Sequence, residues 1–495
     1  MIRTGAPAGA RSAPGGQGRL PAPGAGTGAV HLMGAKGAGM QGLETALEWL
    51  GYEVSGCDLS SGGHDPRHAK GAVALVRSSA IPPDHPEVIA AARAGLAVMT
   101  RAEALGQLLR GRDEITVGIA GSHGKTTITG LTGAGAEAAG LDPLVLVGGR
   151  VSRWDGYART GAGPAVVEAD EYDRSFLQLD PALALVSSVE AEHLDTYGSL
   201  EAIESAFAEF AGRAAGRLGC VWCADDPGAR RIGQLVQERY GAGEAMSYGL
   251  AGDAWCRAMP VEPGATDLLR IKWSEGEVSL RSLLPGRHNR QNIAGAFAVL
   301  LRLGADPEAA AAGLGGFGGA DRRLQTLGRL RHVTIVDDYA HHPTEVAASL
   351  AALRETRPGA RLTVVFQPHL YTRTTALAGD FGRELEAGAD EALVLPVFGA
   401  REPPLLGVTS SLISKAAGPS VRTCDRTEAL DVVRGAAAGG EHLVVFMGAG
   451  DVTDLAREAA AAAAEIEGSG RGPADDSACP DAERRTGACR AHVGA

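Results

Sequence analysis

The chain is poor in cysteine, in aromatic side chains and in long apolar runs. It has 7 cysteines among 495 residues, an odd and scattered set that argues against a disulfide scaffold. No apolar run approaches the roughly 20 residues of a membrane-spanning helix, and residues 1–28 have no signal-peptide core, so we expect a cytoplasmic protein with no membrane partner. Acidic residues outnumber basic ones by 59 to 47, a net charge of −12, which argues against nucleic acid and favours a small partner.

Metal-binding patterns are also scarce. Cys220 and Cys223 form one C-x-x-C without a second pair or a nearby histidine, and Cys57 and Cys256 stand alone. Zinc sites recognised from sequence show four ligands at characteristic spacings. The sequence therefore indicates no zinc or redox site.

The length and the apolar content predict several cores. At roughly 150 residues per domain the chain predicts about three domains, and 45% hydrophobic with 21% charged residues is typical of a globular protein. Short apolar runs bounded by glycine alternate with amphipathic stretches, which predicts an α/β protein with parallel sheets covered by helices. The expected strands are Val30–Met33, Thr116–Ala120, Ala165–Glu168, Ala182–Val189, Thr334–Val336, Leu362–Phe366, Glu391–Val397 and His442–Met447, with helices over Met40–Leu50 and Thr126–Ala139.

Composition also suggests where the domains end. Polar residues 110–114 and the Gly- and Arg-rich residues 313–331 precede new strand series, which predicts units at 29–112, 113–326 and 327–466. Segments 1–28 and 467–495 are rich in Gly, Pro, Ala and charge without periodicity. We expect both to be disordered tails outside the fold.

A phosphate-binding loop is the strongest single motif. It follows the strand Thr116–Ala120, opens a helix, and reads Gly121, Ser122, His123, Gly124, Lys125, Thr126 and Thr127. Glycines let backbone N–H groups face phosphate oxygens, Lys125 reaches the terminal phosphates, and the Thr126 hydroxyl can bind Mg²⁺. The first glycine of the strict Walker pattern would fall on Ile119, so this is a shorter form. A glycine-rich helix start with an incidental lysine is the alternative.

Two acidic clusters follow the next strands. Residues 168–173 read Glu-Ala-Asp-Glu-Tyr-Asp, and residues 190–195 read Glu-Ala-Glu-His-Leu-Asp. The carboxyl ends of parallel strands meet at one edge of a sheet, so both clusters are expected beside the phosphate loop. There they suggest a two-metal or a metal-plus-base site. Taken alone, the first cluster is equally typical of a solvated loop.

A second glycine-rich turn lies near the N-terminus. Residues 34–42 follow a strand and open a helix, and Asp58 follows the next apolar run. This spacing resembles a dinucleotide-binding turn, for which a dehydrogenase is the usual enzyme, and a ligand-free tight turn is the alternative. A nucleotide bound by its diphosphate fits this turn together with the phosphate loop.

Further polar motifs occupy residues 286–292, 321–323, 337–345 and 366–373. Arg323 and Arg373 can stabilise a transferring phosphoryl group or bind a carboxylate. The adjacent His341 and His342 point apart, which argues against both binding one metal ion. Each motif alone is more typical of a surface loop.

In their order along residues 30–460, these motifs resemble those of the Mur ligases. The matching segments are H-x-M-G-x-x-G-x-G-M-x-G-L at 31–43, V-S-G-C-D at 54–58, S-S-A-I at 78–81, G-S-H-G-K-T-T at 121–127, V-E-A-D-E-Y-D, E-A-E-H-L-D-T-Y, G-R-H-N, D-D-Y-A-H-H-P-T-E, F-Q-P-H-L-Y-T-R-T, and G-A-G-D at 448–451. The resemblance implies Rossmann-like N- and C-terminal domains, for a UDP-sugar and an amino acid, around a central P-loop ATPase α/β domain.

The implied activity is ATP-dependent amide formation in peptidoglycan precursor synthesis. ATP phosphorylates the carboxylate of UDP-N-acetylmuramate, and the amine of L-alanine attacks the acyl phosphate, releasing ADP and phosphate. The last three motifs favour L-alanine as acceptor over the tripeptide of a sister recycling ligase. A silent nucleotide-binding regulator and a dehydrogenase remain alternatives; Lys125, Glu168 and His193 argue against the first and the phosphate loop against the second. The implied partners are the two substrates and ATP with Mg²⁺, in a monomer or homodimer.

The resemblance also implies residue roles. Lys125 contacts phosphates, Thr126 and Glu168, preferred over Glu171, hold one Mg²⁺, and His193 holds a second. Asn289, Asn292, Arg323 and Asp337 join residues 121–127 around ATP. Gly34, Gly37, Gly39, Asp58 and Ser79 hold the UDP-sugar, and His341 and Arg373 face the substrate carboxylates.

The chain departs from the family pattern at a few positions. Ser188 and Glu192 stand where an asparagine and an aspartate are more usual, which leaves the geometry of the second metal site open. Leu370 replaces an arginine of some members, and Lys36 lies within the first glycine turn.

Overall fold

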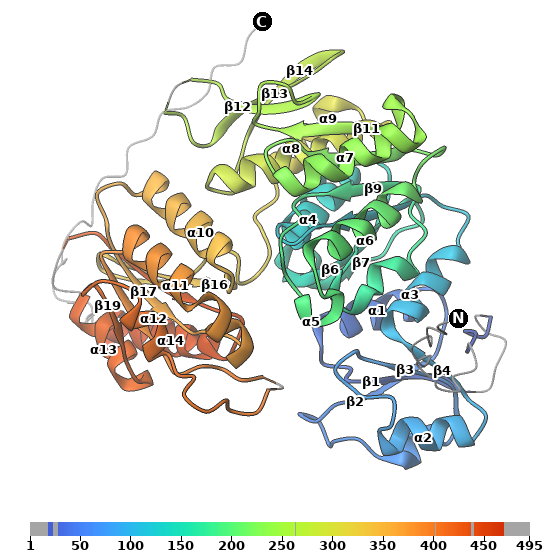
Figure 1. The fold of residues 1–495 in the computed structure, drawn as a ribbon, viewed down its shortest axis with the longest axis horizontal. Coiled ribbons are helices and arrows are strands. Elements are labelled where there is room, and N and C mark those ends of the chain that lie inside the picture. The colour runs from blue at the N-terminus through green and yellow to red at the C-terminus, as the bar shows by residue number, and fades with distance from the viewer. Residues whose placement is uncertain (1–17, 23–27, 263, 401, 437–439, 470–495) are drawn as a thin grey trace, which may run out of the picture.

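The computed structural model describes residues 18–22, 28–262, 264–400, 402–436 and 440–469. These form three sheets, one for each successive part of the chain, with helices between the strands. Figure 1 shows the three parts in blue, in cyan through green to yellow, and in orange to red. The prediction of an α/β protein with parallel sheets is confirmed. No helix among the described residues has the length and apolar character that crossing a membrane requires.

The N-terminal sheet has four parallel strands in the order β2 (Val54–Cys57), β1 (Ala29–Met33), β3 (Ala72–Arg77) and β4 (Ala97–Thr100). The connecting elements are α1 (Ala38–Trp49), the 3-10 helix η1 (Pro66–Ala69), α2 (Pro86–Arg93) and α3 (Arg101–Arg110). Parallel strands are covered on both faces, which explains why β1 is buried from Val30 to Met33, His31 included. The carboxyl ends of β1 and β2 carry the first glycine turn and Asp58.

Residues 18–22 lie within the segment 1–28 that we expected outside the fold, and for them that expectation is wrong. Leu20 is buried in the core, and its backbone N–H donates to Gln107 Oε1 at 2.9 Å. The Tyr52 hydroxyl donates to the Pro21 carbonyl at 2.9 Å. Apolar burial and satisfied backbone groups offset the entropy of ordering this short segment. Residues 1–17, 23–27 and 470–495 of the expected tails lie outside the described residues.

The middle sheet has ten strands in the order β14, β13, β12, β11, β10, β9, β5, β8, β6, β7. Its strands are β5 (Thr116–Ala120), β6 (Leu144–Val151), β7 (Gly156–Arg159), β8 (Ala165–Glu168), β9 (Leu183–Val186), β10 (Gly219–Cys223), β11 (Ala245–Gly249), β12 (Cys256–Pro260), β13 (Leu268–Trp273) and β14 (Gly276–Arg281). Central β5 pairs in parallel with β8 and β9, whereas β12 to β14 extend the sheet in antiparallel fashion. The loops after β5, β8 and β9 therefore share one edge.

The helices of the middle part are α4 (Lys125–Ala138), α5 (Leu194–Tyr197), α6 (Leu200–Gly212), α7 (Pro227–Tyr240), α8 (Arg287–Arg302) and α9 (Pro307–Gly315), with 3-10 turns η2 (Ser152–Trp154), η3 (Tyr172–Gln178) and η4 (Ala242–Glu244). Helix α4 is buried from Thr126 to Ala136. Its glycines allow close packing, since a Cβ at Gly135 would lie 2.3 Å from Leu300 Cδ1. This packing fixes the start of α4, where the phosphate loop ends.

The C-terminal sheet has six strands in the order β15 (Gln325–Leu330), β16 (Val333–Asp338), β20 (His442–Met447), β17 (Arg361–Phe366), β18 (Glu391–Val394) and β19 (Val421–Thr423). Only the pairing of β15 with β16 is antiparallel among those described in this sheet. Its helices are α10 (Pro343–Thr356), α11 (Tyr371–Gly388), α12 (Ser411–Lys415), α13 (Arg426–Ala436) and α14 (Val452–Ser469). The polar residues after β16 and β17 again share one sheet edge.

We expect Leu300→Ala to destabilise the middle part by about 2 to 5 kcal/mol. Leu300 is fully buried against α4, so truncation removes apolar contact and leaves a cavity. Leu235→Ala is the matched control, because Leu235 is 45% exposed on α7 and its truncation should cost under about 0.5 kcal/mol. Urea unfolding followed by circular dichroism measures both. Equal midpoints for the two variants would contradict the packing described here.

Candidate active site

A cavity of about 1270 Å³ lies where the three parts of the chain meet. The N-terminal part contributes Gly39, Ser79 and Arg101 to its lining. The middle part contributes most of the phosphate loop and the loops after β8 and β9, and the C-terminal part contributes the loops after β16 and β17. Pockets for one drug-sized ligand measure roughly 300 to 1,000 Å³. This cavity is large enough for more than one such ligand.

The phosphate loop turns through two glycines with positive φ, Gly121 at 139° and Gly124 at 83°. Side chains are disfavoured in this region, so the turn requires glycine at Gly124. A Cβ there would also lie 2.7 Å from Asn292 Oδ1. The Ile128 N–H donates to the Gly124 carbonyl, so the preceding amides of α4 have no acceptor within the helix. Those amides and the positive end of the helix make an anion site.

The loop after β9 supports the phosphate loop from the side. The Ser122 N–H donates to the Ser188 carbonyl and the His123 N–H to the Ser188 hydroxyl, both at 2.9 Å. The Glu190 N–H donates to the Ser122 hydroxyl at 3.0 Å. Ser188, one of the departures from the family pattern, therefore holds the conformation of the phosphate loop.

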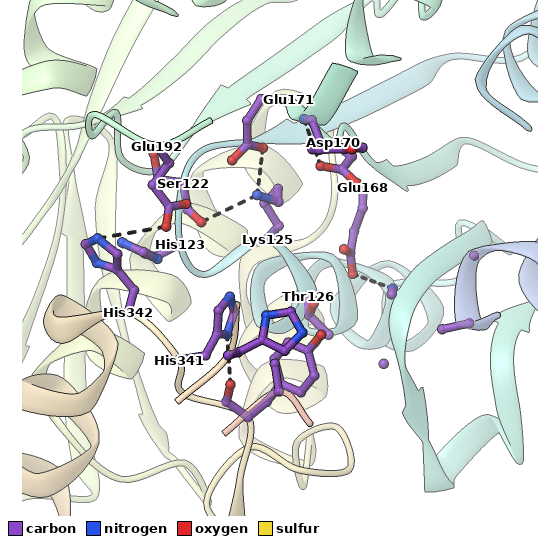
Figure 2. A pocket seen from close by; sticks show the side chains of 18 of the residues that line it. Ser122, His123, Lys125, Thr126, Glu168, Asp170, Glu171, Glu192, His341 and His342 are labelled. Carbon is purple, nitrogen blue, oxygen red and sulfur yellow. Dashed lines mark hydrogen bonds and ion pairs between the residues drawn. The ribbon is translucent and has the colours of Figure 1, made fainter. Parts of the chain in front are cut away.

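Lys125 is held by carboxylates at the end of β8. Its Nζ donates to Glu171 Oε2 at 2.7 Å (Figure 2). It also donates to the Gly121 carbonyl at 2.5 Å. Burial opposes the charge on Lys125, but Glu171 and Asp170 outweigh it and raise its pKa. Burial raises the pKa of Glu171, which Lys125 partly offsets. Lys125 is thus kept as a cation beside the anion site.

Glu168 and Thr126 face each other across the same edge of the sheet. The Glu168 Oε1 accepts the Gly148 N–H at 2.5 Å, and Thr126 lines the same cavity. Burial raises the pKa of Glu168, so a neighbouring cation would relieve the cost of its charge. Because Glu171 is engaged with Lys125, Glu168 is the carboxylate of this pair better placed to accept Mg²⁺ with Thr126.

A second group of possible ligands lies between the two acidic clusters. Ligand atoms of Glu171, Glu192 and His193 lie within 4.8 Å of one another. His193 adopts a left-handed conformation, with φ of 53°, and its ring contacts Tyr172 edge-on at 5.3 Å. Glu192, another departure from the family pattern, reaches this group with its longer side chain.

His123 of the phosphate loop joins the middle part to the C-terminal part. Its Nε2 lies 3.3 Å from Glu190 Oε2, and its Nδ1 lies 3.4 Å from Glu345 Oε1. Burial lowers the pKa of His123, but the two carboxylates outweigh it and raise the pKa to about 10. The Arg323 guanidinium lies 3.6 Å from the same Glu345 oxygen. His123 is therefore a fixed positive charge at the mouth of the loop.

The C-terminal part adds two candidate carboxylate-binding groups. The His341 Nδ1–H donates to the Tyr339 carbonyl at 2.9 Å, which leaves Nε2 as the other ring nitrogen for a ligand (Figure 2). Burial lowers the pKa of His341. Arg373 lies 3.8 Å from Glu192 and also lines the cavity. Arg373 thus approaches the acidic loop after β9, and His341 lines the same cavity.

Family profiles match three successive stretches of the chain. They describe a Mur ligase family catalytic domain at 29–113, a Mur ligase middle domain at 119–300 and a Mur ligase glutamate ligase domain at 322–450. The UDP-N-acetylmuramate–L-alanine ligase of Kineococcus radiotolerans is 42% identical over 454 residues, covering 87% of this chain and 95% of that protein. The chain belongs to the Mur ligase family.

Other Mur ligases extend the similarity. The UDP-N-acetylmuramate–L-alanine ligase of Nitratidesulfovibrio vulgaris is 37% identical over 449 residues, covering 86% of this chain and 97% of that protein. The crystal structure of UDP-N-acetylmuramate–alanine ligase from Thermotoga maritima has a TM-score of 0.72 at 21% identity, covering 90% of this chain and all of that one. A murein peptide ligase from Psychrobacter arcticus has a TM-score of 0.63 at 20% identity, covering 88% and 98%. The two structures share the Mur ligase fold.

The structure brings most residues with predicted Mur ligase roles to the cavity. Those that line it are Ser122, His123, Gly124, Lys125, Thr126, Glu168, His193, Arg323, His341, Arg373, Gly39 and Ser79. Asn289 and Asn292 lie behind the loop, where Asn292 Nδ2 donates to Asn289 Oδ1 at 3.1 Å. Asp337 is buried and accepts the Thr453 hydroxyl at 2.6 Å. Gly34, Gly37 and Asp58 are not among the described residues that line this cavity.

Sequence reasoning gave no role to three residues that organise this Mur ligase site. Glu171 holds Lys125, and Glu190 and Glu345 hold His123. Glu345 ends the D-D-Y-A-H-H-P-T-E motif, and the other two lie in the acidic clusters. Their partners could not be read from spacing, since each pair joins different elements.

We expect His123→Gln to reduce the loss of stability at alkaline pH. A pKa of about 10, raised from 6.5, means that protonated His123 contributes its full stabilisation below 6.5 and loses it as pH rises through about 10. The thermal midpoint of the wild type should therefore fall more steeply over this range than that of the variant. His332→Gln, at an exposed turn residue, serves as control. Parallel curves for all three proteins would contradict the pairing with Glu190 and Glu345.

Proposed function

We propose that this Mur ligase joins L-alanine to the carboxylate of UDP-N-acetylmuramate at the expense of ATP, in peptidoglycan precursor synthesis. The observation that carries the proposal is the cavity shared by the three parts, with the phosphate loop on one wall and His341 and Arg373 on another. An enzyme that activates one substrate and couples it to another needs all three ligands in one space. The names of the full-length relatives support the same reaction.

The reaction needs a strong positive field. A carboxylate is a poor acyl donor, and phosphorylation gives it a good leaving group through a highly charged transition state. Lys125, the amides of the phosphate loop and protonated His123 supply fixed positive charge. Thr126 and Glu168 would hold one Mg²⁺ and His193 with its neighbouring carboxylates a second. Bound there, Mg²⁺ would neutralise phosphate charge.

The two other substrates are assigned to different parts of the chain. Gly39 and Ser79 lie on the wall formed by the N-terminal part, and Gly34, Gly37 and Asp58 lie on the same sheet edge behind it, which supports this part as the UDP-sugar site. Arg373 presents a planar guanidinium that can bind a carboxylate in bidentate fashion. Arg373 Nη2 lies 3.8 Å from Glu192 Oε1, which is longer than a hydrogen bond, so a substrate carboxylate can replace this contact.

The proposal keeps the three units predicted from composition, at 29–112, 113–326 and 327–466. The three separate sheets support a division into three units. The structure differs at the edges of the third unit, since β15 begins at Gln325 and α14 runs to Ser469. We keep a cytoplasmic monomer or homodimer as part of the proposal.

We expect phosphate release from ATP to require both UDP-N-acetylmuramate and L-alanine. With Mg²⁺ and UDP-N-acetylmuramate, adding L-alanine should start steady release, and the cell-wall tripeptide should not. The measurement is a coupled phosphate assay with mass spectrometry of the sugar nucleotide. Release only with the tripeptide would move the chain to the recycling ligases. No release with either acceptor would contradict ligase activity and favour a nucleotide-binding regulator.

Lys125→Ala should lower the rate of ATP turnover by at least about a hundredfold, because a charged donor at the transferring phosphate is lost. Affinity for UDP-N-acetylmuramate, measured by calorimetry, should change little, since this ligand is assigned to another part of the chain. Lys272→Ala is the control, since Lys272 is exposed on β13. Equal loss of turnover and of sugar-nucleotide affinity would contradict the assignment of the ligands to separate domains.

A further inference from the structure

A second cluster of polar side chains is buried in the N-terminal part, away from the cavity. His31 lies on β1, Cys57 at the end of β2, His68 on η1 and Glu87 on α2. The side chain of Glu87 is fully buried, and His31 and Cys57 are 3% and 4% exposed. None of the four lines the cavity described above. Four elements of the fold therefore converge on one buried point that the ligase chemistry does not use.

The ligand atoms of the four residues all lie within 4.8 Å of one another. His31 Nε2 is 3.0 Å from Glu87 Oε1 and 3.3 Å from Cys57 Sγ. His68 Nδ1 is 3.3 Å and Cys57 Sγ 3.5 Å from the same Glu87 oxygen. Zinc bonds of about 2.0 to 2.3 Å place tetrahedral ligands about 3.3 to 3.7 Å apart. The cluster already has nearly this spacing.

The charge of Glu87 lacks a fixed counterion. Within the described residues its ion-pair contacts are all to histidines, namely His31, His64 and His68. A carboxylate without water or a cation is costly to bury. The Nδ1 atom of His68 is also buried, and it makes no hydrogen bond within the part of the chain that the structure describes. A divalent cation among these four atoms would balance Glu87 and bind the Nδ1 atom of His68.

Surrounding groups orient the ligands. His31 Nδ1 lies 2.9 Å from the Ser55 hydroxyl, which leaves Nε2 facing the cluster. The Asp65 N–H donates to Glu87 Oε2 at 2.9 Å, which leaves Oε1 as the inner oxygen. His64 Nδ1 lies 3.1 Å from Cys57 Sγ and can hydrogen-bond the sulfur. Metal-binding histidines and carboxylates are commonly held by such outer hydrogen bonds.

We propose that His31, Cys57, His68 and Glu87 form a structural zinc site. The donor set of two imidazoles, one thiolate and one carboxylate fills a tetrahedral shell without an open position, as structural zinc sites do. On binding, the Cys57 thiol releases its proton to solvent as the sulfur–zinc bond forms. Thiolate and carboxylate then neutralise Zn²⁺, so the buried site carries no net charge.

The site would stiffen the edge that carries the first glycine turn. The Cys57 carbonyl accepts the Gly34 N–H at 2.8 Å and the Ala35 N–H at 3.1 Å. A metal bound to Cys57 therefore fixes the end of β2 directly behind this turn, and it ties η1 and α2 to the same edge. The expected contribution is to the stability of the N-terminal part.

Cobalt titration of the reduced full-length protein tests the proposal. Co²⁺ replaces Zn²⁺ in tetrahedral sites, and a cysteine thiolate bound to it gives a charge-transfer absorption in the near ultraviolet that histidine and carboxylate ligands do not give. This distinguishes the cluster from the acidic groups of the active site, which contain no cysteine. We expect the band to saturate at about one equivalent, zinc to abolish it, and zinc to raise the thermal midpoint.

Four variants make the result specific. Cys57→Ser should lose the band, and His68→Gln, at a partly exposed ligand, should weaken cobalt binding at least about tenfold. Cys256→Ser, at a buried cysteine of the middle part, should behave as the wild type, as should Cys220→Ser. If Cys57→Ser does not fold, His68→Gln decides. A wild type without the band and without a zinc-dependent midpoint, or a band that survives in Cys57→Ser, would overturn the proposal.

Discussion

The active site depends on the parallel pairing of β5 with β8 and β9. This pairing brings the phosphate loop, the acidic loop after β8 and the loop after β9 to one edge. Lys125, Glu168 and Ser188 then meet although they come from three separate loops. The buried helix α4 begins at Lys125 and fixes the end of the phosphate loop. Without this register, the carboxylates would be solvated loop residues with no common target.

Cations and carboxylates that line the cavity balance one another's charge. Lys125 with Glu171, His123 with Glu345, and Arg373 with Glu192 each place a cation against a carboxylate. Two of these pairs join the middle part to the C-terminal part. Arg373 lies 3.8 Å from Glu192, which is longer than a hydrogen bond, so the carboxylate of a substrate can compete for this cation.

The sequence predicted features formed by neighbouring residues, and it missed contacts between elements that are far apart in the chain. Strands such as Thr116–Ala120 and the phosphate loop were recognised because their signals lie within a few neighbouring residues. The antiparallel strands β12 to β14 were missed, since they alternate exposed and buried positions rather than forming apolar runs. Cys57 stands alone in the sequence, yet the fold surrounds it with His31 and Glu87. Pairings between distant elements cannot be recovered from the spacing within either one.

The first glycine turn and the phosphate loop are each held in place by a different set of contacts. A loop that binds a reacting ligand must be held rigidly, because a displacement of about 1 Å between reacting groups can cost a hundredfold in rate. Behind the phosphate loop, this rigidity comes from Ser188 and from the packing of α4. Behind the first turn, the Cys57 carbonyl holds the amides, and Cys57 belongs to the buried cluster around Glu87. If the N-terminal part binds the sugar nucleotide, as proposed above, a buried cluster that fixes one end of β2 also fixes the position of that ligand relative to the phosphate loop.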